Sequence, residues 1–195
     1  MISEDYQRQL VEVRERDENN GLRWGASGGR NFGATLVAFI RRRSQVISIL
    51  DFGCGHGTLK MYVDEHLEAS PLKDGRKLEW TEYDPGMPGK DIPPEGTFDL
   101  IVSSDVLEHV EPDQIDAALE WCTAHSKRQF HWISCSTSTK LLPDGRSVHL
   151  IVEPLEWWMK KFDWPGWDIQ SYSAHWTRKR EQWGKYCCIQ TDKLG

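Results

Sequence analysis

The sequence predicts a three-layer α/β fold, in which helices cover both faces of a mostly parallel sheet that ends in an antiparallel hairpin. Short apolar runs bounded by glycine alternate with segments whose apolar residues recur every three or four positions, as buried strands and amphipathic helices do. The last two apolar segments, residues 167–176 and 183–191, alternate in polarity on either side of the polar residues 177–182. This arrangement is typical of a hairpin.

Residues 1–44 are expected to form two helices ahead of the core. One apolar stripe runs over residues 6–13 and a second over residues 32–40, and the glycine-rich residues 25–30 separate them. The glycine-rich stretch could act as a lid. The core itself is predicted to occupy residues 45–195, and the whole chain to form one domain.

In the core, the sequence pattern predicts alternating strands and helices. Its four strands before the hairpin are expected at residues 46–52, 78–83, 98–104 and 130–135. Helices are expected over residues 59–67, 115–122 and 155–162. Because ligands bind outside the carboxyl ends of the strands in such sheets, functional residues are to be sought in the loops that follow the strands.

Composition excludes several classes of protein. The chain has 195 residues and a net charge of −6, which suits one domain and disfavours a globally basic nucleic-acid binder. No apolar run approaches the roughly 18 residues of a membrane helix, and the charged N-terminus does not resemble a signal peptide. We therefore expect a cytoplasmic protein that makes no membrane contact. The five cysteines, none in a C-x-x-C pair, agree with a reducing compartment.

The first core strand leads into the glycine loop Asp51-Phe-Gly-Cys-Gly-His-Gly57. Alternating glycines allow a tight turn and let a ligand approach the backbone, because no Cβ intervenes. A dinucleotide fingerprint would place its third glycine at position 58, where this chain has threonine, and no Gly-Lys-Ser/Thr follows as in a P-loop. The loop therefore argues against a nicotinamide or flavin dinucleotide and against a P-loop nucleotide site.

Two segments, I-L-D-F-G-C-G-H-G and F-D-L-I-V-S-S-D-V-L-E-H-V, together resemble class I S-adenosylmethionine-dependent methyltransferases. More narrowly, the chain is similar to the small stand-alone methyltransferases of bacteria and their phages. The resemblance implies a Rossmann-like fold, S-adenosylmethionine as cofactor and S-adenosylhomocysteine as product. It implies that the cofactor is bound by Asp51, Gly53, Cys54, Gly55, Gly57, Tyr83, Asp84, Ser104, Asp105 and Val106. Asp84 is implied to hold the ribose, since a carboxylate can accept two hydroxyl hydrogen bonds.

Two further groups of cofactor contacts are predicted outside these motifs. The family places a helix and a strand between the ribose-binding acid and the next core strand. Too few residues lie between Asp84 and the strand expected at residues 98–104 to form both, so a shortened loop is expected there. Asp91 and Ile92 in that loop are candidates to touch the adenine. Trp24 and Arg30 are expected to close over the cofactor, with Arg30 pairing with its carboxylate.

Three residues are predicted to act on the acceptor: His149, His109 and Asp105. His109 and Asp105 lie in the D-V-L-E-H segment after the third strand, and His149 precedes the helix at residues 155–162. A histidine base contributes about 10²–10⁴-fold when the acceptor carries a proton. No metal site is expected, because Glu108 and His109 have no second histidine at ligand spacing and no H-E-x-x-H is present.

These observations predict a methyltransferase that acts on an oxygen or nitrogen atom of a small-molecule or saccharide-like acceptor. Two alternatives remain open. The basic runs at residues 41–43 and 178–180 would suit a nucleic-acid acceptor if they joined one basic face beside the pocket. The shortened core would suit a module that binds the cofactor without turnover.

Overall fold

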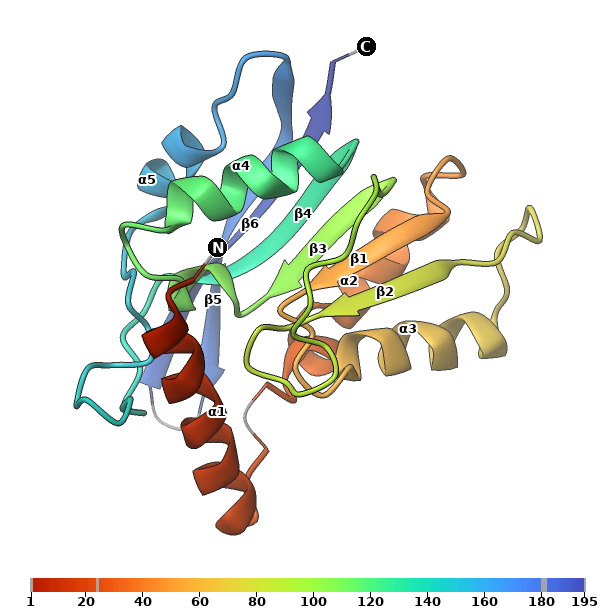
Figure 1. Ribbon diagram of the computed structural model, residues 1–195. Helices are drawn as coiled ribbons and strands as arrows, with labels where there is room; N and C mark the ends of the chain where they lie inside the picture. The colour runs from red at the N-terminus through yellow and green to blue at the C-terminus, as the bar shows by residue number, and fades with distance from the viewer. Residues whose placement is uncertain (1, 24, 180–181, 195) are drawn as a thin grey trace.

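Six strands of the described residues form one sheet in this computed structural model (Figure 1). The structure describes residues 2–23, 25–179 and 182–194, with the backbone alone at 174–179 and 182–185. The strands are β1 (Ser48–Phe52), β2 (Glu79–Tyr83), β3 (Leu100–Ser104), β4 (Arg128–Ser134), β5 (Trp167–Lys179) and β6 (Gln182–Lys193). Their order is β2-β1-β3-β4-β6-β5; the first four are parallel, and β6 is antiparallel to both of its neighbours.

Helices cover both faces of this sheet. They are α1 (Glu4–Asn19), α2 (Gly28–Arg41), α3 (Thr58–Ala69), α4 (Ile115–His125) and α5 (Leu155–Lys161), with the 3₁₀ turn η1 (Leu107–His109) after β3. On one face, Phe32 of α2 and Leu59 of α3 share a buried cluster with Leu100 of β3. On the other face, Leu119 of α4 and Trp158 of α5 share a second buried cluster with the sheet. The predicted three-layer α/β sandwich is confirmed.

Helix α1 lies outside these layers, across the carboxyl ends of the central strands (Figure 1). Ser3 caps its first turn by accepting a hydrogen bond from the backbone N–H of Tyr6, at 3.2 Å. Its buried face packs against Leu142 and Val148 of the long loop after β4. This packing places α1 over the edge of the sheet at which ligands bind in such folds.

The shortened region is confirmed as well. Residues 84–99 contain no helix and no strand, and the chain passes from β2 to β3 through a loop. The terminal hairpin is also present, although its strands continue to Lys179 and start again at Gln182, further than the polarity pattern indicates. The turn η1 is an addition that no periodicity predicted, because one turn is too short to show a period.

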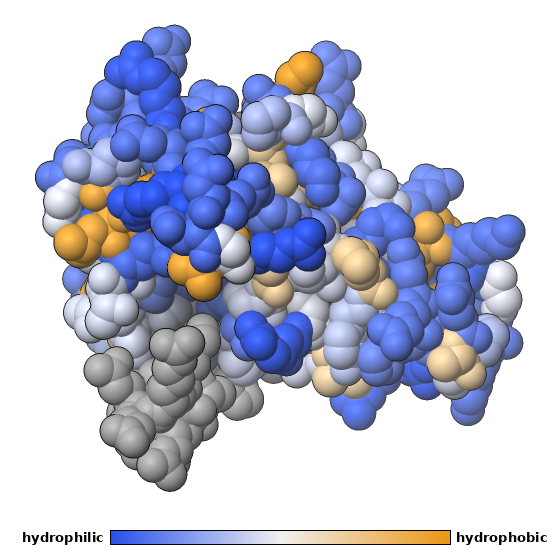
Figure 2. Space-filling model, turned by 90° about the horizontal axis from the view of Figure 1, so that it is seen from below, coloured by the Kyte–Doolittle hydropathy of each residue, from blue (hydrophilic) through white to orange (hydrophobic). Residues whose placement is uncertain are grey.

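Figure 2 views the molecule from the side on which α1 lies in Figure 1, and the surface there is largely hydrophilic with scattered hydrophobic residues. Within the described part of the chain, no helix is both long and apolar enough to cross a membrane.

Candidate active site

A cleft lies between α1 and the carboxyl ends of β1, β2 and β3, with an empty volume of about 940 Å³ when its open mouth is included. This is the edge at which the sequence predicted the functional loops to meet. Residues far apart in the chain converge there because parallel strands end at the same edge of a sheet. The predicted site residues that line the cleft are Asp51, Gly53, Cys54, Tyr83, Asp84, Ser104, Asp105, Val106 and His109.

The glycine loop is packed against the segments beside it. Gly53 has a φ of 79°, and a Cβ on it would lie 2.4 Å from the methyl groups of Val106. A Cβ on Gly55 would lie 2.4 Å from the carbonyl oxygen of Gly25. Glycine is thus required at both positions by close approach, and the backbone of the loop is left exposed toward the cleft at Gly53.

Asp51, at the end of β1, has a buried carboxylate with an unused acceptor. The residue is 2% exposed, and its Oδ2 has no hydrogen-bond partner among the residues that the structure describes. Burial, together with the nearby Glu82 and Asp84, raises the pKa of this carboxyl to about 8. A ligand with a cationic or N–H donor would satisfy this oxygen, since buried polar groups are normally paired.

Asp84, at the end of β2, is bound on both oxygens by Arg14 of α1. The guanidinium donates to Oδ1 at 2.7 Å and to Oδ2 at 2.8 Å. The backbone N–H groups of Gly55 and Gly86 donate to the same carboxylate, each at 2.9 Å. These four bonds use the acceptor capacity of a carboxylate. Ribose hydroxyls on Asp84 would therefore take the place of the Arg14 guanidinium.

The sequence analysis missed Arg14, although a signal was present. Arg14 lies four positions after Leu10 and eight after Tyr6, so it continues the buried stripe of α1. Its side chain is only 10% exposed. A charged residue on the buried face of a helix is a sign of a buried partner.

Asp105, at the end of β3, adopts a φ of 56°, the only positive value at a described non-glycine residue. Its carboxylate accepts hydrogen bonds from Ser27 Oγ at 3.1 Å and from Asn31 Nδ2 at 2.8 Å. Strained backbone of this kind persists where surrounding contacts hold it, and such residues cluster at functional sites. The two partners at the start of α2 thereby fix Asp105 at the wall of the cleft.

His109 and His149, forty positions apart in the sequence, lie side by side in the structure. Their ring centroids are 4.8 Å apart at an interplanar angle of 85°. His109 Nδ1 bonds the Val148 carbonyl at 2.6 Å, and His149 Nδ1 bonds the Ser136 carbonyl at 2.5 Å. Burial lowers the pKa of His109 to about 3, with His149 as the second cause. His109 lines the cleft, whereas His149 is not part of the lining.

Several predicted contacts are not brought to the cleft. Arg30 is exposed on α2 and does not line it, so Arg14, and not Arg30, is the arginine of this site. Asp91 and Ile92 are also exposed and absent from the lining, Ile92 at 81%. Trp24 lies outside the described residues. The glycine-rich stretch does line the cleft through Gly25, Ser27 and Gly28, so the lid stays a prediction, whereas the adenine prediction has no support in the lining.

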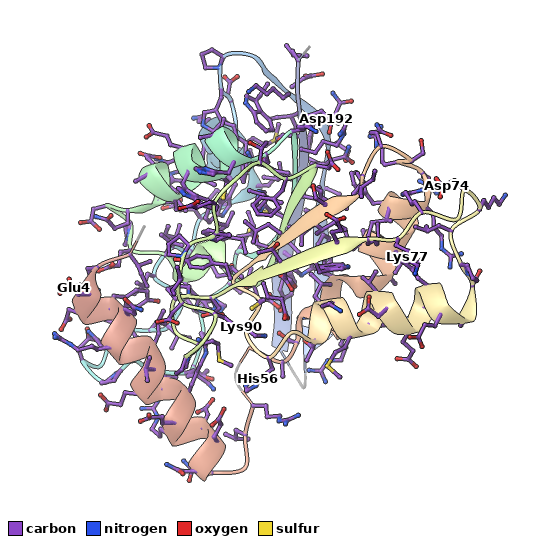
Figure 3. The ribbon with its side chains drawn as sticks, turned by 45° about the vertical axis from the view of Figure 1, so that its right-hand side comes forward. Glu4, His56, Asp74, Lys77, Lys90 and Asp192 are labelled. Atoms are coloured by element: carbon purple, nitrogen blue, oxygen red, sulfur yellow. The ribbon has the colours of Figure 1, made fainter. Side chains whose placement is uncertain are left out.

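The shortened loop after β2 places Lys90 against the glycine loop, to which His56 belongs (Figure 3). Lys90 Nζ lies 3.1 Å from Glu82 Oε1 and 3.5 Å from the Gly55 carbonyl oxygen. The Lys90 carbonyl also accepts a hydrogen bond from the Asp84 backbone N–H at 2.8 Å. These contacts dock the shortened loop on the glycine loop and brace the end of β2.

Comparison with known proteins was made by sequence and by fold. A family model described as a methyltransferase domain matches residues 29–192. No match was found among curated protein sequences. By fold, the chain is similar to the 1,6-didemethyltoxoflavin N1-methyltransferase of Burkholderia thailandensis, solved with 1,6-didemethyltoxoflavin and S-adenosylhomocysteine. The TM-score is 0.59 at 16% identity, over 97% of this chain and 87% of that one.

Two further solved structures have the same fold. The DhpI complex with S-adenosylhomocysteine gives a TM-score of 0.51 at 18% identity, over 97% of each chain. The magnesium protoporphyrin IX methyltransferase (ChlM) of Synechocystis PCC 6803, with bound S-adenosylhomocysteine, gives 0.51 at 14% identity, over 87% of this chain and 85% of that one. At these identities, the comparison establishes a shared fold.

Proposed function

We propose, from the premise that this chain belongs to the methyltransferase domain family, that it transfers a methyl group from S-adenosylmethionine to an oxygen or nitrogen atom of a small-molecule acceptor. One observation carries the proposal. The glycine loop and the carboxylates of Asp51 and Asp84 meet in a single cleft at the carboxyl ends of the parallel strands. That is the edge at which ligands bind in sheets of this type.

The residues present fit this cofactor. The glycine loop lines the cleft at Gly53 and Cys54, and the unpaired Oδ2 of Asp51 offers an acceptor for an ammonium group. Asp84 would hold the ribose hydroxyls once Arg14 releases it, and the segment of Asp105 would lie near the amino-acid part. When bound, S-adenosylmethionine supplies an activated methyl group. The residues of the chain then align the acceptor and exclude water. In well-oriented reactions, such alignment lowers the activation barrier by about 7–11 kcal/mol.

Helix α1 and the positions of the basic runs favour a small acceptor over a nucleic acid. The first run, at residues 41–43, follows the end of α2, a helix of 14 residues and so about 21 Å long. Gly28, at the other end of α2, lines the cleft. In the second run, residues 178 and 179 end β5 at the carboxyl edge of the sheet, and Arg180 lies outside the described residues. The described backbone of the two runs thus lies at opposite edges of the sheet, which supports a small acceptor over a nucleic acid.

Similar structures agree with a small acceptor. The N1-methyltransferase of Burkholderia thailandensis, with the same fold, holds bound 1,6-didemethyltoxoflavin together with S-adenosylhomocysteine. A saccharide-like acceptor belongs to the same proposal. A non-catalytic module would bind the cofactor equally well, but would release no S-adenosylhomocysteine in the presence of any acceptor.

Calorimetric titration of the purified chain tests the proposal. Micromolar binding of S-adenosylmethionine and S-adenosylhomocysteine is expected, with no binding of NAD. Asp84→Asn should weaken both by at least about tenfold, because an amide cannot accept two ribose hydroxyls as a carboxylate does. Glu79→Gln is the matched control, since Glu79 is an exposed carboxylate at the other end of β2. Circular dichroism confirms that each variant is folded. Absence of binding by the wild-type chain would overturn the proposal.

A further inference from the structure

Glu108, His109 and His149 form a cluster beside the cleft that the proposed cofactor contacts do not use. One carboxylate oxygen and one nitrogen from each ring lie within 4.8 Å of one another. Glu108 and His109 belong to η1, and His149 lies in the loop before α5. Two imidazoles and one carboxylate are a donor set that divalent transition metals take.

Hydrogen bonds hold the two segments of this cluster together. The backbone N–H groups of Leu150 and Ile151 donate to the Glu108 carbonyl oxygen, at 2.8 and 3.0 Å. His109 Nδ1 bonds the Val148 carbonyl oxygen at 2.6 Å. The loop that carries His149 is therefore docked on η1 from both sides of the histidine. The three side chains are positioned by the backbone before any ion binds.

The same bonds determine which ring nitrogen can act as a ligand. Because a carbonyl oxygen only accepts, Nδ1 of His109 and Nδ1 of His149 both carry the hydrogen. In a neutral imidazole the lone pair is then on Nε2. A metal-ligating histidine typically donates its other N–H to a backbone carbonyl in this way.

Glu108 provides an independent observation. The residue is 0% exposed; its Oε1 accepts the Ser134 backbone N–H at 2.9 Å, while Oε2 has no hydrogen-bond partner in the described part of the chain. None of the ion pairs found among those residues includes it. Buried polar groups are normally paired, and a bound cation would pair with this unpartnered carboxylate oxygen.

We propose that Glu108, His109 and His149 bind one divalent transition-metal ion at the wall of the cleft. Imidazole ligands suit ions such as Zn²⁺, Fe²⁺ and Mn²⁺, whereas Mg²⁺ prefers oxygen ligands. Metal–ligand bonds of about 2.0–2.2 Å bring donor atoms to about 3–3.5 Å from one another, so the side chains draw inward when the ion binds. The proposal departs from the expectation of no metal site, which considered only ligands close in sequence.

The position of the site indicates what the ion would do. His109 lines the cleft, so coordination positions not used by the three side chains are open to an acceptor there. An oxygen-bearing acceptor, such as a hydroxyl compound, would complete the coordination, and a metal ion lowers the pKa of a bound hydroxyl. This role of the acceptor rests on the proposed function, whereas metal binding itself does not.

The first experiment measures metal binding to the full chain after treatment with a chelator. Calorimetric titration with ZnCl₂ and with MnCl₂ should show one ion per chain, and MgCl₂ should bind at least tenfold more weakly. His149→Ala and Glu108→Gln should each weaken Zn²⁺ binding by at least about tenfold. His125→Ala is the matched control, because His125 lies on α4 outside the cluster and its Nδ1 bonds the Trp121 carbonyl oxygen. Its binding should equal that of the wild type.

A second measurement uses the wild-type chain, so it does not depend on whether the variants fold. Paramagnetic Mn²⁺ should broaden the imidazole NMR signals of His109 and His149 before that of His125. Absence of binding, or binding that broadens all three signals alike, would overturn the metal site. Titration with S-adenosylhomocysteine in the presence of chelator keeps the two proposals apart. Retained nucleoside binding with no metal binding rejects the metal site alone; metal binding with no nucleoside binding rejects the proposed function and the acceptor role.

Discussion

Asp51 and His131 are both buried, and burial moves their pKa values in opposite directions. Asp51 has a pKa of about 8 in the folded chain, mainly through burial, against 3.8 ordinarily, so it lowers stability as pH rises from about 3.8 to 8. Burial lowers the pKa of His131 from 6.5 to about 3. The unfolded chain then takes up the proton first, so His131 lowers stability as pH falls from 6.5 toward 3.

His131→Gln should remove part of the acid sensitivity of the fold. In the wild type, His131 is held neutral between Ser103 Oγ at 2.8 Å and Gln129 Oε1 at 3.0 Å. The contribution of His131 to the free energy of unfolding falls by about 1.4 kcal/mol per pH unit below 6.5, or by about 2 kcal/mol at pH 5. The loss of unfolding free energy between pH 7 and pH 5 should be smaller by that amount in the variant. Urea unfolding with chelator present measures this free energy at both pH values. The contribution of Asp51 cancels when the variant is compared with the wild type. An unchanged difference between the two pH values would contradict the prediction.

Gly53→Ala should be more damaging than an alanine at a glycine with similar backbone. Gly53 and Gly89 have φ of 79° and 84°, but a Cβ on Gly89 meets nothing within 4 Å, whereas one on Gly53 meets Val106. Gly89→Ala should therefore cost about 1–2 kcal/mol of unfolding free energy for the left-handed backbone alone. Gly53→Ala should cost more and also weaken S-adenosylhomocysteine binding. Thermal unfolding and calorimetry compare the two, and equal losses would show that Val106 yields to the added methyl group.

At the scale of elements, α1 controls access to Asp84. Its first turn is tied to the loop after η1 by Ser3, whose N–H and Oγ donate to the Glu111 carboxylate at 2.7 and 2.8 Å. Tyr6 Oη donates to the His109 carbonyl oxygen at 2.5 Å. Further along, Arg14 bonds Asp84. The helix therefore joins the end of the cleft at Asp84 to the segment that carries His109.

Arg14→Gln should bind S-adenosylhomocysteine more tightly while making the chain less stable. The variant frees the oxygens of Asp84 that ribose hydroxyls would use. It also breaks a buried ion pair, at a cost of about 3 kcal/mol of unfolding free energy. Arg16→Gln is the control on the same helix, since Arg16 donates only to the exposed Leu141 carbonyl oxygen at 2.8 Å. Its stability should change by less than about 0.5 kcal/mol. Weaker nucleoside binding by Arg14→Gln would mean that Arg14 positions Asp84 and does not compete for it.

Across the whole molecule, apolar packing divides the chain into a sandwich and an attached helix. Two buried clusters, one on each face of the sheet, include α2, α3, α4 and α5. Helix α1 belongs to a separate and smaller cluster with Leu142 and Val148. Segments with fewer buried apolar contacts open at lower free energy than the core.

Amide exchange should therefore be faster in α1 than in α2, although both precede the first strand. Mass spectrometry of exchanged peptides covering residues 4–19 and 28–41 gives the comparison. Saturation with S-adenosylhomocysteine should change exchange in α1 and leave α5 unchanged, because α5 has no residue in the lining of the cleft. Equal protection of α1 and α2 would contradict this division.

The sequence alone determined the fold class, the order of elements and the glycine loop. Each of these depends on local information: apolar periodicity, turn chemistry, or spacing between neighbouring strands. The shortened loop after β2 was also predicted, because chain length limits what a short segment can form. The geometry of parallel sheets also predicted that residues at the ends of β1, β2 and β3 would meet, and these residues line the cleft.

Only the tertiary structure decided which distant side chains meet. It placed Arg14 on Asp84, left Arg30 in solvent and put the end of α2 and the end of β5 at opposite edges of the sheet. It also brought His149 to Glu108 and His109, through a loop docked by backbone hydrogen bonds. Spacing in the chain carries no information about such contacts, because they depend on how α1 and the long loops pack over the sheet.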